Sequence, residues 1–273
     1  MPLRVGRIPF LVCAPFFFNS VGRENVFFDT EFFDGPPSVH CVGLKDGSIH
    51  LSPASSITFA QKPGAFVLSP SLCTSCSFEV RSVKLFSRYP IEELSNKRIR
   101  MTSQSKTSVT LLRILLENRY GLSPEYVPGL AAEESDDACL LIGNLALEEN
   151  ERHRFAYSYD LGTLWQEWQG LPFVFGAWII SKEALSPGLR PTLECYMEHL
   201  EKGIQEFRRD PAKALDVWLS KYPVSLPRPI VEDYFSVLDY RFTDERKESL
   251  AIFFKLAAQM GLVESAPPIE FLQ

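Results

Sequence analysis

The chain has 273 residues, more than one compact core usually needs, so we expect either one large domain or two lobes. Hydrophobic residues make up 45% of it and charged residues 23%, the proportions of an ordinary soluble globular protein. The formal net charge of −6 excludes the broad basic surface with which many proteins bind nucleic acids. An anionic ligand must therefore be held by a few local donors.

The N-terminal segment begins with a predicted strand, residues 3–8, and continues as an apolar run to Phe18. Two arginines precede this run, as in a signal peptide, but Pro9 and Pro15 interrupt it and no small-residue cleavage pattern follows. We interpret the run as a first strand and a loop of the active site. No stretch reaches the roughly 18–20 apolar residues of a membrane span, so we expect a cytoplasmic protein.

Short strands and helices alternate through the next part of the chain. Gly35-Pro-Pro37 marks a turn, and Ser38 is the expected N-cap of a helix that ends before Gly47. Strands are predicted for residues 27–33, 49–52, 65–68 and 79–87, helices for residues 38–46 and 55–61, and a helical turn for residues 91–94.

The strand predicted for residues 98–102 runs into a hydroxyl-rich turn, which opens an amphipathic helix reaching Tyr120. The turn contains Ser103, Ser105, Thr107 and Ser108. The first backbone N–H groups of a helix have no partner within it and carry partial positive charge, so this turn suits a carboxylate or a phosphate. A hydroxyl here can also serve only as the helix cap. The residue pattern leaves both interpretations open.

The second half of the chain begins with a continuous apolar run, residues 139–142, typical of a central strand. Gly143 and Asn144 are then expected to turn the chain. A helix is predicted for residues 160–169 and a strand for residues 172–180. Everything after Ser181 is predicted to be helical. Four helices are predicted there. Three of them span residues 191–207, 229–238 and 243–261, and the fourth is capped by Asp210 and has Pro211 at its first position.

This alternation predicts an α/β fold. Residues 86–178 form a self-contained series of strands and helices and are predicted to be the second lobe. The first lobe then combines residues 1–85 with residues 179–273, and the chain crosses between the lobes near residues 82–86 and 176–178. A cleft between two such lobes is where a ligand is expected to bind.

The six cysteines include one C-x-x-C pair, Cys73 and Cys76. Such a pair can be a redox motif or half of a zinc site. No second pair and no matching pair of histidines accompanies it in the sequence. We therefore expect these cysteines to pack as small apolar residues in a reducing compartment, and we predict no metal site.

Eight short motifs, taken in order and at sensible spacing, resemble the chorismate dehydratase family of the futalosine route to menaquinone. They are Val5-Gly-Arg-Ile-Pro-Phe-Leu11, Gly35-Pro-Pro-Ser38, Pro53-Ala-Ser-Ser-Ile57, Val80-Arg-Ser-Val-Lys-Leu-Phe86, Ser105-Lys-Thr-Ser108, Leu141-Ile-Gly-Asn-Leu-Ala146, Tyr159-Asp-Leu-Gly162 and Gly170-Leu-Pro-Phe-Val-Phe-Gly-Ala-Trp178. The segment after Ser181 contributes little to the resemblance.

The resemblance implies a two-lobed fold of the type II periplasmic-binding-protein kind, with a central cleft and a helical C-terminal region. It implies a cytoplasmic hydro-lyase that removes water from chorismate, a small dicarboxylate, to give 3-[(1-carboxyvinyl)oxy]benzoate. It implies neither a metal nor an organic cofactor. From the charge and the absence of a long apolar stretch, we also expect no nucleic-acid or membrane partner. The chain departs from the family pattern at Cys13 and Cys41, where the family usually has Asn, and at Asn144, where it has Asp.

The candidate site residues follow from their place in the predicted fold and from the family resemblance. The candidate catalytic residues are Ser82, Cys13 and Asn144. The candidate substrate-binding residues are Arg7, Ser55, Ser56, Arg81, Ser105, Thr107, Ser108 and Trp178. The matched motifs contain no obvious base, and His40 and His50 are expected to be packing histidines, so one hypothesis is that a substrate carboxylate takes the proton. Two alternatives stay open: a non-catalytic binding protein for small carboxylates, and another futalosine-pathway enzyme of the same fold.

Overall fold

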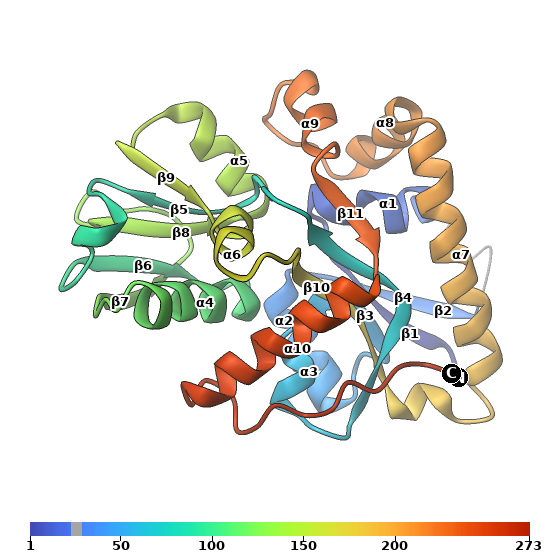
Figure 1. The fold of residues 1–273 in the computed structure, drawn as a ribbon. Coiled ribbons are helices and arrows are strands. Elements are labelled where there is room, and N and C mark those ends of the chain that lie inside the picture. Colours follow the sequence, from blue (N-terminus) through green and yellow to red (C-terminus); the bar gives the residue numbers. More distant parts are fainter. Residues whose placement is uncertain (23–28) are drawn as a thin grey trace.

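Two β-sheets, each covered by helices, lie side by side in the computed structural model, which describes residues 1–22 and 29–273 (Figure 1). The six-stranded sheet has the order β11-β4-β10-β3-β1-β2 and the five-stranded sheet has the order β7-β6-β8-β5-β9. We call each sheet with its covering helices the large lobe and the small lobe, respectively. The prediction of a two-lobed α/β fold is confirmed.

The large lobe has a mixed sheet. Its strands β1, β2 and β3 are parallel, and β10 runs antiparallel between β3 and β4, whose other edge pairs with β11. The strands are β1 Leu3–Arg7, β2 Thr30–Asp34, β3 Leu51–Ser55, β4 Phe66–Cys76, β10 Phe173–Ser181 and β11 Leu238–Arg241.

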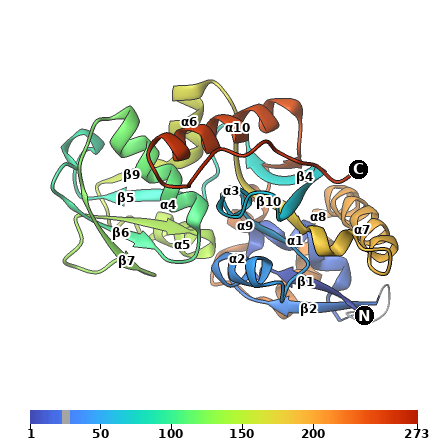
Figure 2. The same cartoon turned by 90° about the horizontal axis from the view of Figure 1, so that it is seen from below.

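In the described part of the chain the large lobe has seven α-helices: α1 Ala14–Phe17, α2 Pro37–Asp46, α3 Thr58–Gln61, α7 Arg190–Arg209, α8 Pro211–Lys221, α9 Arg228–Tyr234 and α10 Asp244–Gln259. Both chain termini lie at the outer end of the large lobe (Figure 1, Figure 2). In the described part of the chain, no helix is both long and apolar enough to cross a membrane.

The small lobe is built around β8, all five residues of which are buried. Strands β6 and β7 run parallel, as do β6 and β8, whereas β5 runs antiparallel to both β8 and β9. The strands are β5 Val83–Ser87, β6 Arg98–Thr102, β7 Glu125–Gly129, β8 Ala138–Ile142 and β9 Tyr157–Asp160. The helices are α4 Lys106–Arg113, which continues as a π-helix over Ile114–Arg119, α5 Gly143–Arg152 and α6 Leu161–Gln169.

Several strands escaped the sequence analysis because they are short, polar or at sheet edges, where the hydrophobic pattern is weak. Strands β7 and β9 form the two edges of the small sheet, and β11 forms an edge of the large sheet. The prediction that everything after Ser181 is helical is therefore wrong at β11. Strand β4 runs past Leu68 to Cys76 because it continues to pair with β10 beyond the polar Ser-Pro-Ser interruption.

Three further boundaries differ from the prediction. Gly143 begins α5 instead of a simple turn. The N-cap of α2 is Pro36, so Ser38 lies in the first turn. The strand predicted for residues 27–33 falls partly on residues 23–28, outside the described residues, and the described strand begins at Thr30.

The chain passes from one sheet to the other in two places. The first passage lies between the end of β4 at Cys76 and the start of β5 at Val83, and the second lies between the end of α6 at Gln169 and the start of β10 at Phe173. Helix α10 packs on β10 and also reaches α6, where the Trp165 indole N–H donates to the Ser249 hydroxyl over 3.0 Å. The exact lobe limits at residues 86 and 178 stay a prediction.

Both cysteines of the C-x-x-C pair are buried in β4. The Cys73 thiol donates to the carbonyl of Arg241, and the Cys76 thiol donates to the carbonyl of Phe78. Burial raises the pKa of the Cys73 thiol to about 12, so it stays protonated at neutral pH. Among the described residues no group of three His, Cys, Asp or Glu side chains is placed to hold a metal ion.

His40 is buried on α2 and is hydrogen-bonded at both ring nitrogens. Its Nε2–H donates to the carbonyl of Phe33 over 3.0 Å, which leaves Nδ1 to accept from the Ser52 hydroxyl over 2.9 Å. Burial lowers the pKa of His40 to about 4, against the smaller opposing effects of the Phe33 carbonyl and Asp34. The ring therefore stays neutral and structural.

We expect the free energy of unfolding to fall as the pH falls from 6.5 towards 4. Over this window the unfolded chain takes up a proton at His40 while the folded chain does not, because the folded pKa is the lower one. This residue alone should contribute about 3 kcal/mol. A His40→Gln variant does not titrate, so its denaturant unfolding curves should give a flatter pH profile. An equally steep profile in that variant would assign the effect to other groups.

Candidate functional site

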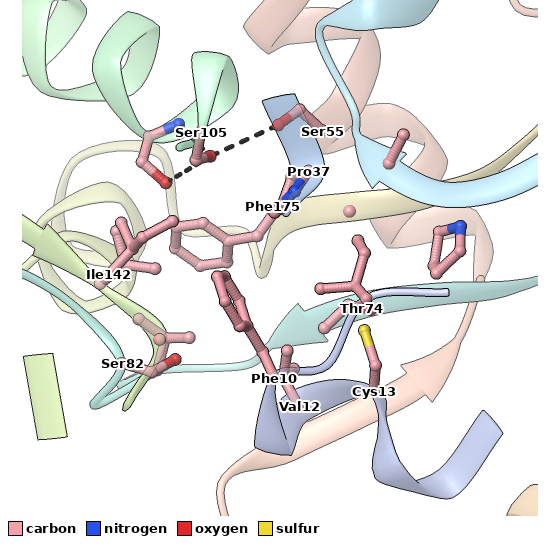
Figure 3. Close-up of a pocket in the computed structure, with 18 residues that line it drawn as sticks. Phe10, Val12, Cys13, Pro37, Ser55, Thr74, Ser82, Ser105, Ile142 and Phe175 are labelled. Atoms are coloured by element: carbon pink, nitrogen blue, oxygen red, sulfur yellow. Dashed lines mark hydrogen bonds between the residues drawn. The ribbon is translucent and has the colours of Figure 1, made fainter. Parts of the chain in front are cut away.

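A cavity of about 80 Å³ lies where the two lobes meet. Its walls are mostly apolar and come from both lobes and from the first passage between them (Figure 3). The lining residues are Ile8, Phe10, Val12, Cys13, Pro37, Pro53, Ala54, Ser55, Thr74, Val80, Ser82, Val83, Ser105, Ser108, Ile142, Gly143, Phe175 and Gly176. Among these described residues none carries a charged side chain.

Three serine hydroxyls form a cluster in one wall, which we call the serine cluster: Ser55, Ser105 and Ser108. Ser105 lies 2.9 Å from Ser108 and 3.5 Å from Ser55, measured between hydroxyl oxygens, so the cluster joins the two lobes. Ser105 also caps α4 by accepting from the backbone N–H of Ser108 over 3.2 Å. Capping and cavity lining therefore occur together, because the capped helix end itself faces the cavity.

Several helices begin at this cavity. Ser105 precedes α4, Gly143 begins α5, and Pro37 begins α2, and all three residues line the cavity. Each N-terminus carries partial positive charge from the aligned peptide dipoles. Such helix ends are suited to an anion even where, as here, the lining holds no basic side chain.

The passage from β4 to β5 makes a sharp turn beside the cavity. The backbone N–H of Ser82 donates to the carbonyl of Val80 over 2.7 Å, and Arg81 between them has a φ of 60°. These are the marks of a γ-turn with its central residue in the left-handed region, a conformation that costs energy and needs external support. The Asp160 carboxylate supplies it by accepting from the N–H groups of Val80 and Arg81. Ser82, the last residue of this turn, lines the cavity.

Cys13 lines the cavity from the end of the segment before α1, where Leu11–Cys13 form a short 3-10 helix. Burial raises the pKa of its thiol well above the usual range, so it remains a neutral thiol at physiological pH. Two contacts hold its loop: the Asn144 side-chain oxygen accepts from the N–H of Leu11 over 3.4 Å, and the Tyr240 hydroxyl donates to the carbonyl of Val12 over 2.9 Å. Asn144 thus supports the loop across the lobe interface and does not itself line the cavity.

Ser56 and Thr107 lie outside the cavity lining and join the lobes. The Thr107 hydroxyl oxygen accepts from the backbone N–H of Ile57 over 3.1 Å and lies 3.2 Å from the Ser56 hydroxyl. Ser56 in turn donates to the carbonyl of Val174 over 2.9 Å. These hydroxyls stabilise the contact between the lobes.

The remaining three predicted residues also lie outside the lining. The Arg7 guanidinium is buried, 2.6 Å from the Asp34 carboxylate and stacked over the Phe32 ring. Arg81 bonds Glu79 and Asp233 on the outer side of the passage. Trp178 is fully buried against the rings of Phe16, Phe17 and Tyr196 in the large lobe.

Sequence analysis missed several cavity residues, among them Phe10, Thr74 and Phe175. Thr74 was missed because the predicted strand ended at residue 68, whereas β4 continues to Cys76. Phe10 and Phe175 are two of the chain's 21 phenylalanines, and nothing in the sequence separates them from core residues. In the view of Figure 3 their rings are drawn between the serine cluster and Ser82.

The volume of the cavity is well below the roughly 300 Å³ at which pockets for small-molecule ligands begin. The lobes are therefore in close contact in this structure. The hydrogen bonds of Ser55, Ser56 and Thr107 are among those that join the lobes across the interface.

Comparison with known proteins identifies relatives of this chain. A family model described as menaquinone biosynthesis matches residues 3–259. A chorismate dehydratase from Thermus thermophilus is 28% identical over 183 residues, which cover 60% of this chain and 66% of that relative, slightly less than two thirds.

Solved structures show the same fold at lower identity. A protein from Archaeoglobus fulgidus superposes with a TM-score of 0.77 at 19% identity, covering 95% of this chain and 98% of the other. An alkanesulfonate-binding protein from Xanthomonas axonopodis superposes with a TM-score of 0.65 at 17% identity, covering 96% and 94%. A Candida albicans protein with the generic periplasmic binding protein fold gives a TM-score of 0.70 at 11% identity, covering 100% and 98%.

Proposed function

The chain belongs to the menaquinone biosynthesis family, and from this premise we propose that it is a hydro-lyase that converts chorismate to 3-[(1-carboxyvinyl)oxy]benzoate. The observation that carries the proposal is the interlobe cavity, whose walls combine the serine cluster with helix N-termini and apolar side chains. The likeness to the chorismate dehydratase of Thermus thermophilus supports the choice of substrate. The proposal places the reaction in the cytoplasm and in the futalosine route, as the motif resemblance implies.

This reaction needs the enzyme to position the substrate more than to activate it. Chorismate carries two carboxylates, an enol ether and a ring hydroxyl, and loss of the ring C3 proton and the C4 hydroxyl makes the ring aromatic. The reaction is therefore strongly downhill. The protein must hold a dianion in one conformer and stabilise the charge that develops, which is done by preorganised donors and restricted geometry.

The cavity divides this work between two groups of side chains. We assign the binding of a carboxylate to Ser55, Ser105 and Ser108, and their position in the cavity wall at the N-terminus of α4 supports this role. We assign the contacts with the rest of the substrate, including the leaving hydroxyl, to Ser82 and Cys13, which also line the cavity. The apolar walls exclude water once the lobes close, which strengthens each of these hydrogen bonds.

The base in this proposal is a carboxylate of the substrate itself. Among the described residues lining the cavity there is no Asp, Glu, His or Lys side chain. The Cys13 thiol is also unsuited to the task, because burial raises its pKa. A substrate carboxylate beside C3 can take the proton, while the protein restricts its conformation.

The direct test is incubation of the purified protein with chorismate, followed by separation and mass analysis of the products. We expect a product lighter than chorismate by one water, with an aromatic absorption spectrum. Binding of chorismate without turnover would favour a non-catalytic carboxylate-binding protein. Neither binding nor turnover would point to another substrate, including that of another futalosine-pathway enzyme of this fold.

Cys13→Asn is expected to raise the turnover of chorismate about tenfold. A thiol is a weak donor and a weak acceptor, whereas an Asn side chain offers both a good donor and a good acceptor. A better hydrogen bond to the leaving hydroxyl contributes about 1–2 kcal/mol to the transition state. Steady-state kinetics of the two proteins decide the point. Loss of activity in Cys13→Asn would mean that the loop is packed specifically around the thiol.

A further inference from the structure

We propose that Tyr234, at the end of helix α9 in the C-terminal region, is a positioning residue that orients the Ser82 hydroxyl as a hydrogen-bond donor into the cavity. This role rests on the proposed function, because it concerns how Ser82 meets the substrate. It assigns a part in the reaction to the C-terminal segment, which the sequence motifs left out.

The contact that carries the inference is short and buried. The Tyr234 hydroxyl lies 2.7 Å from the Ser82 hydroxyl, and the two residues are separated by 152 positions in the chain. Only 1% of Tyr234 and 4% of Ser82 is exposed. Within the described residues, each hydroxyl has the other as its one protein hydrogen-bond partner. Ser82 lines the cavity, whereas Tyr234 is not among its lining residues.

Acidity decides which hydroxyl donates. A phenol has a pKa near 10 and is a much better donor than an aliphatic alcohol. Burial raises the pKa of Tyr234 further, so the phenol keeps its proton at neutral pH. We therefore assign Tyr234 as the donor to the Ser82 oxygen. The Ser82 proton is then free to point at the substrate, and its donor strength increases because the same oxygen accepts from Tyr234.

Helix α9 is held against the passage at a second point. Asp233, next to Tyr234, pairs with Arg81, next to Ser82, at 2.5 Å between charged atoms. Two consecutive residues of α9 thus contact two consecutive residues of the turn. Val231, one turn earlier in the helix, is fully buried and anchors α9 in the large lobe. Two elements therefore hold Ser82 in position: the backbone turn to which it belongs and helix α9.

The test is a double-mutant cycle of Tyr234→Phe and Ser82→Ala, read as steady-state kinetics of chorismate conversion. Tyr234→Phe keeps the buried ring and removes only the hydroxyl. We expect it to lower kcat about tenfold with little change in KM, and Ser82→Ala to lower kcat by about one further order of magnitude. The double variant should match Ser82→Ala, because Tyr234 acts through the serine.

A matched control is Tyr157→Phe, which removes the hydroxyl of an exposed tyrosine on β9 and should leave kcat unchanged. Thermal midpoints of all variants show whether they fold like the unsubstituted protein. Unchanged kcat in Tyr234→Phe, or effects that multiply in the double variant, would overturn the role of Tyr234 alone. Absence of turnover in the unsubstituted protein would overturn the proposed function, and this role with it.

Discussion

Ser108→Ala is expected to raise the KM for chorismate roughly ten- to a hundredfold, with a smaller effect on kcat. The Ser108 hydroxyl lines the cavity at the first turn of α4, and it is 2.9 Å from the Ser105 hydroxyl. Loss of one hydrogen bond to a carboxylate in a buried site costs about 1–3 kcal/mol. Because alanine is the best helix former, the substitution does not weaken α4 itself.

The control for this prediction is Ser103→Ala in the same turn. Ser103 is exposed, so its removal should leave KM unchanged. Steady-state kinetics of both variants, with thermal unfolding to check the fold, make the comparison. Equal KM values in Ser108→Ala and the unsubstituted protein would show that the serine cluster only caps α4 and joins the lobes.

Asp160→Ala is expected to lower the free energy of unfolding by about 3 kcal/mol or more, and to lower turnover as well. Its carboxylate accepts from four backbone N–H groups: those of Gly162 and Thr163 at the start of α6, and those of Val80 and Arg81 in the passage between the lobes. Removing it leaves buried donors unsatisfied, at about 1–3 kcal/mol each where water cannot replace the carboxylate. The turn that presents Ser82 then loses its support.

Asp210→Ala provides the matched comparison. Asp210 also caps a helix, α8, by accepting from the N–H of Lys213, but it is exposed and makes no contact with the passage. Its loss should cost only about 1 kcal/mol, the usual value of an N-cap. Denaturant unfolding of the two variants measures the difference. Equal losses would mean that the bonds to Val80 and Arg81 contribute nothing to stability.

Much of the small-lobe framework was predictable because its signals are local. The apolar run of β8 and the hydroxyl-rich turn before α4 each occur within a few consecutive residues. The Asp210 cap was predicted for the same reason, since a cap depends on residues two or three positions apart. The edge strands β7, β9 and β11 were not, because pairing with a distant partner, and not their own pattern, makes them strands.

The candidate site divides in the same way. The sequence by itself determined the α/β class, the hydroxyl-rich turn at the start of α4, and the family to which the chain belongs. Only the tertiary structure decided which polar side chains face the cavity. Arg7 is bound by Asp34, and Thr107 by Ile57, because strands and helices far apart in the chain bring those partners within reach. Tyr234 meets Ser82 for the same reason, and no spacing in the sequence encodes a contact across 152 residues.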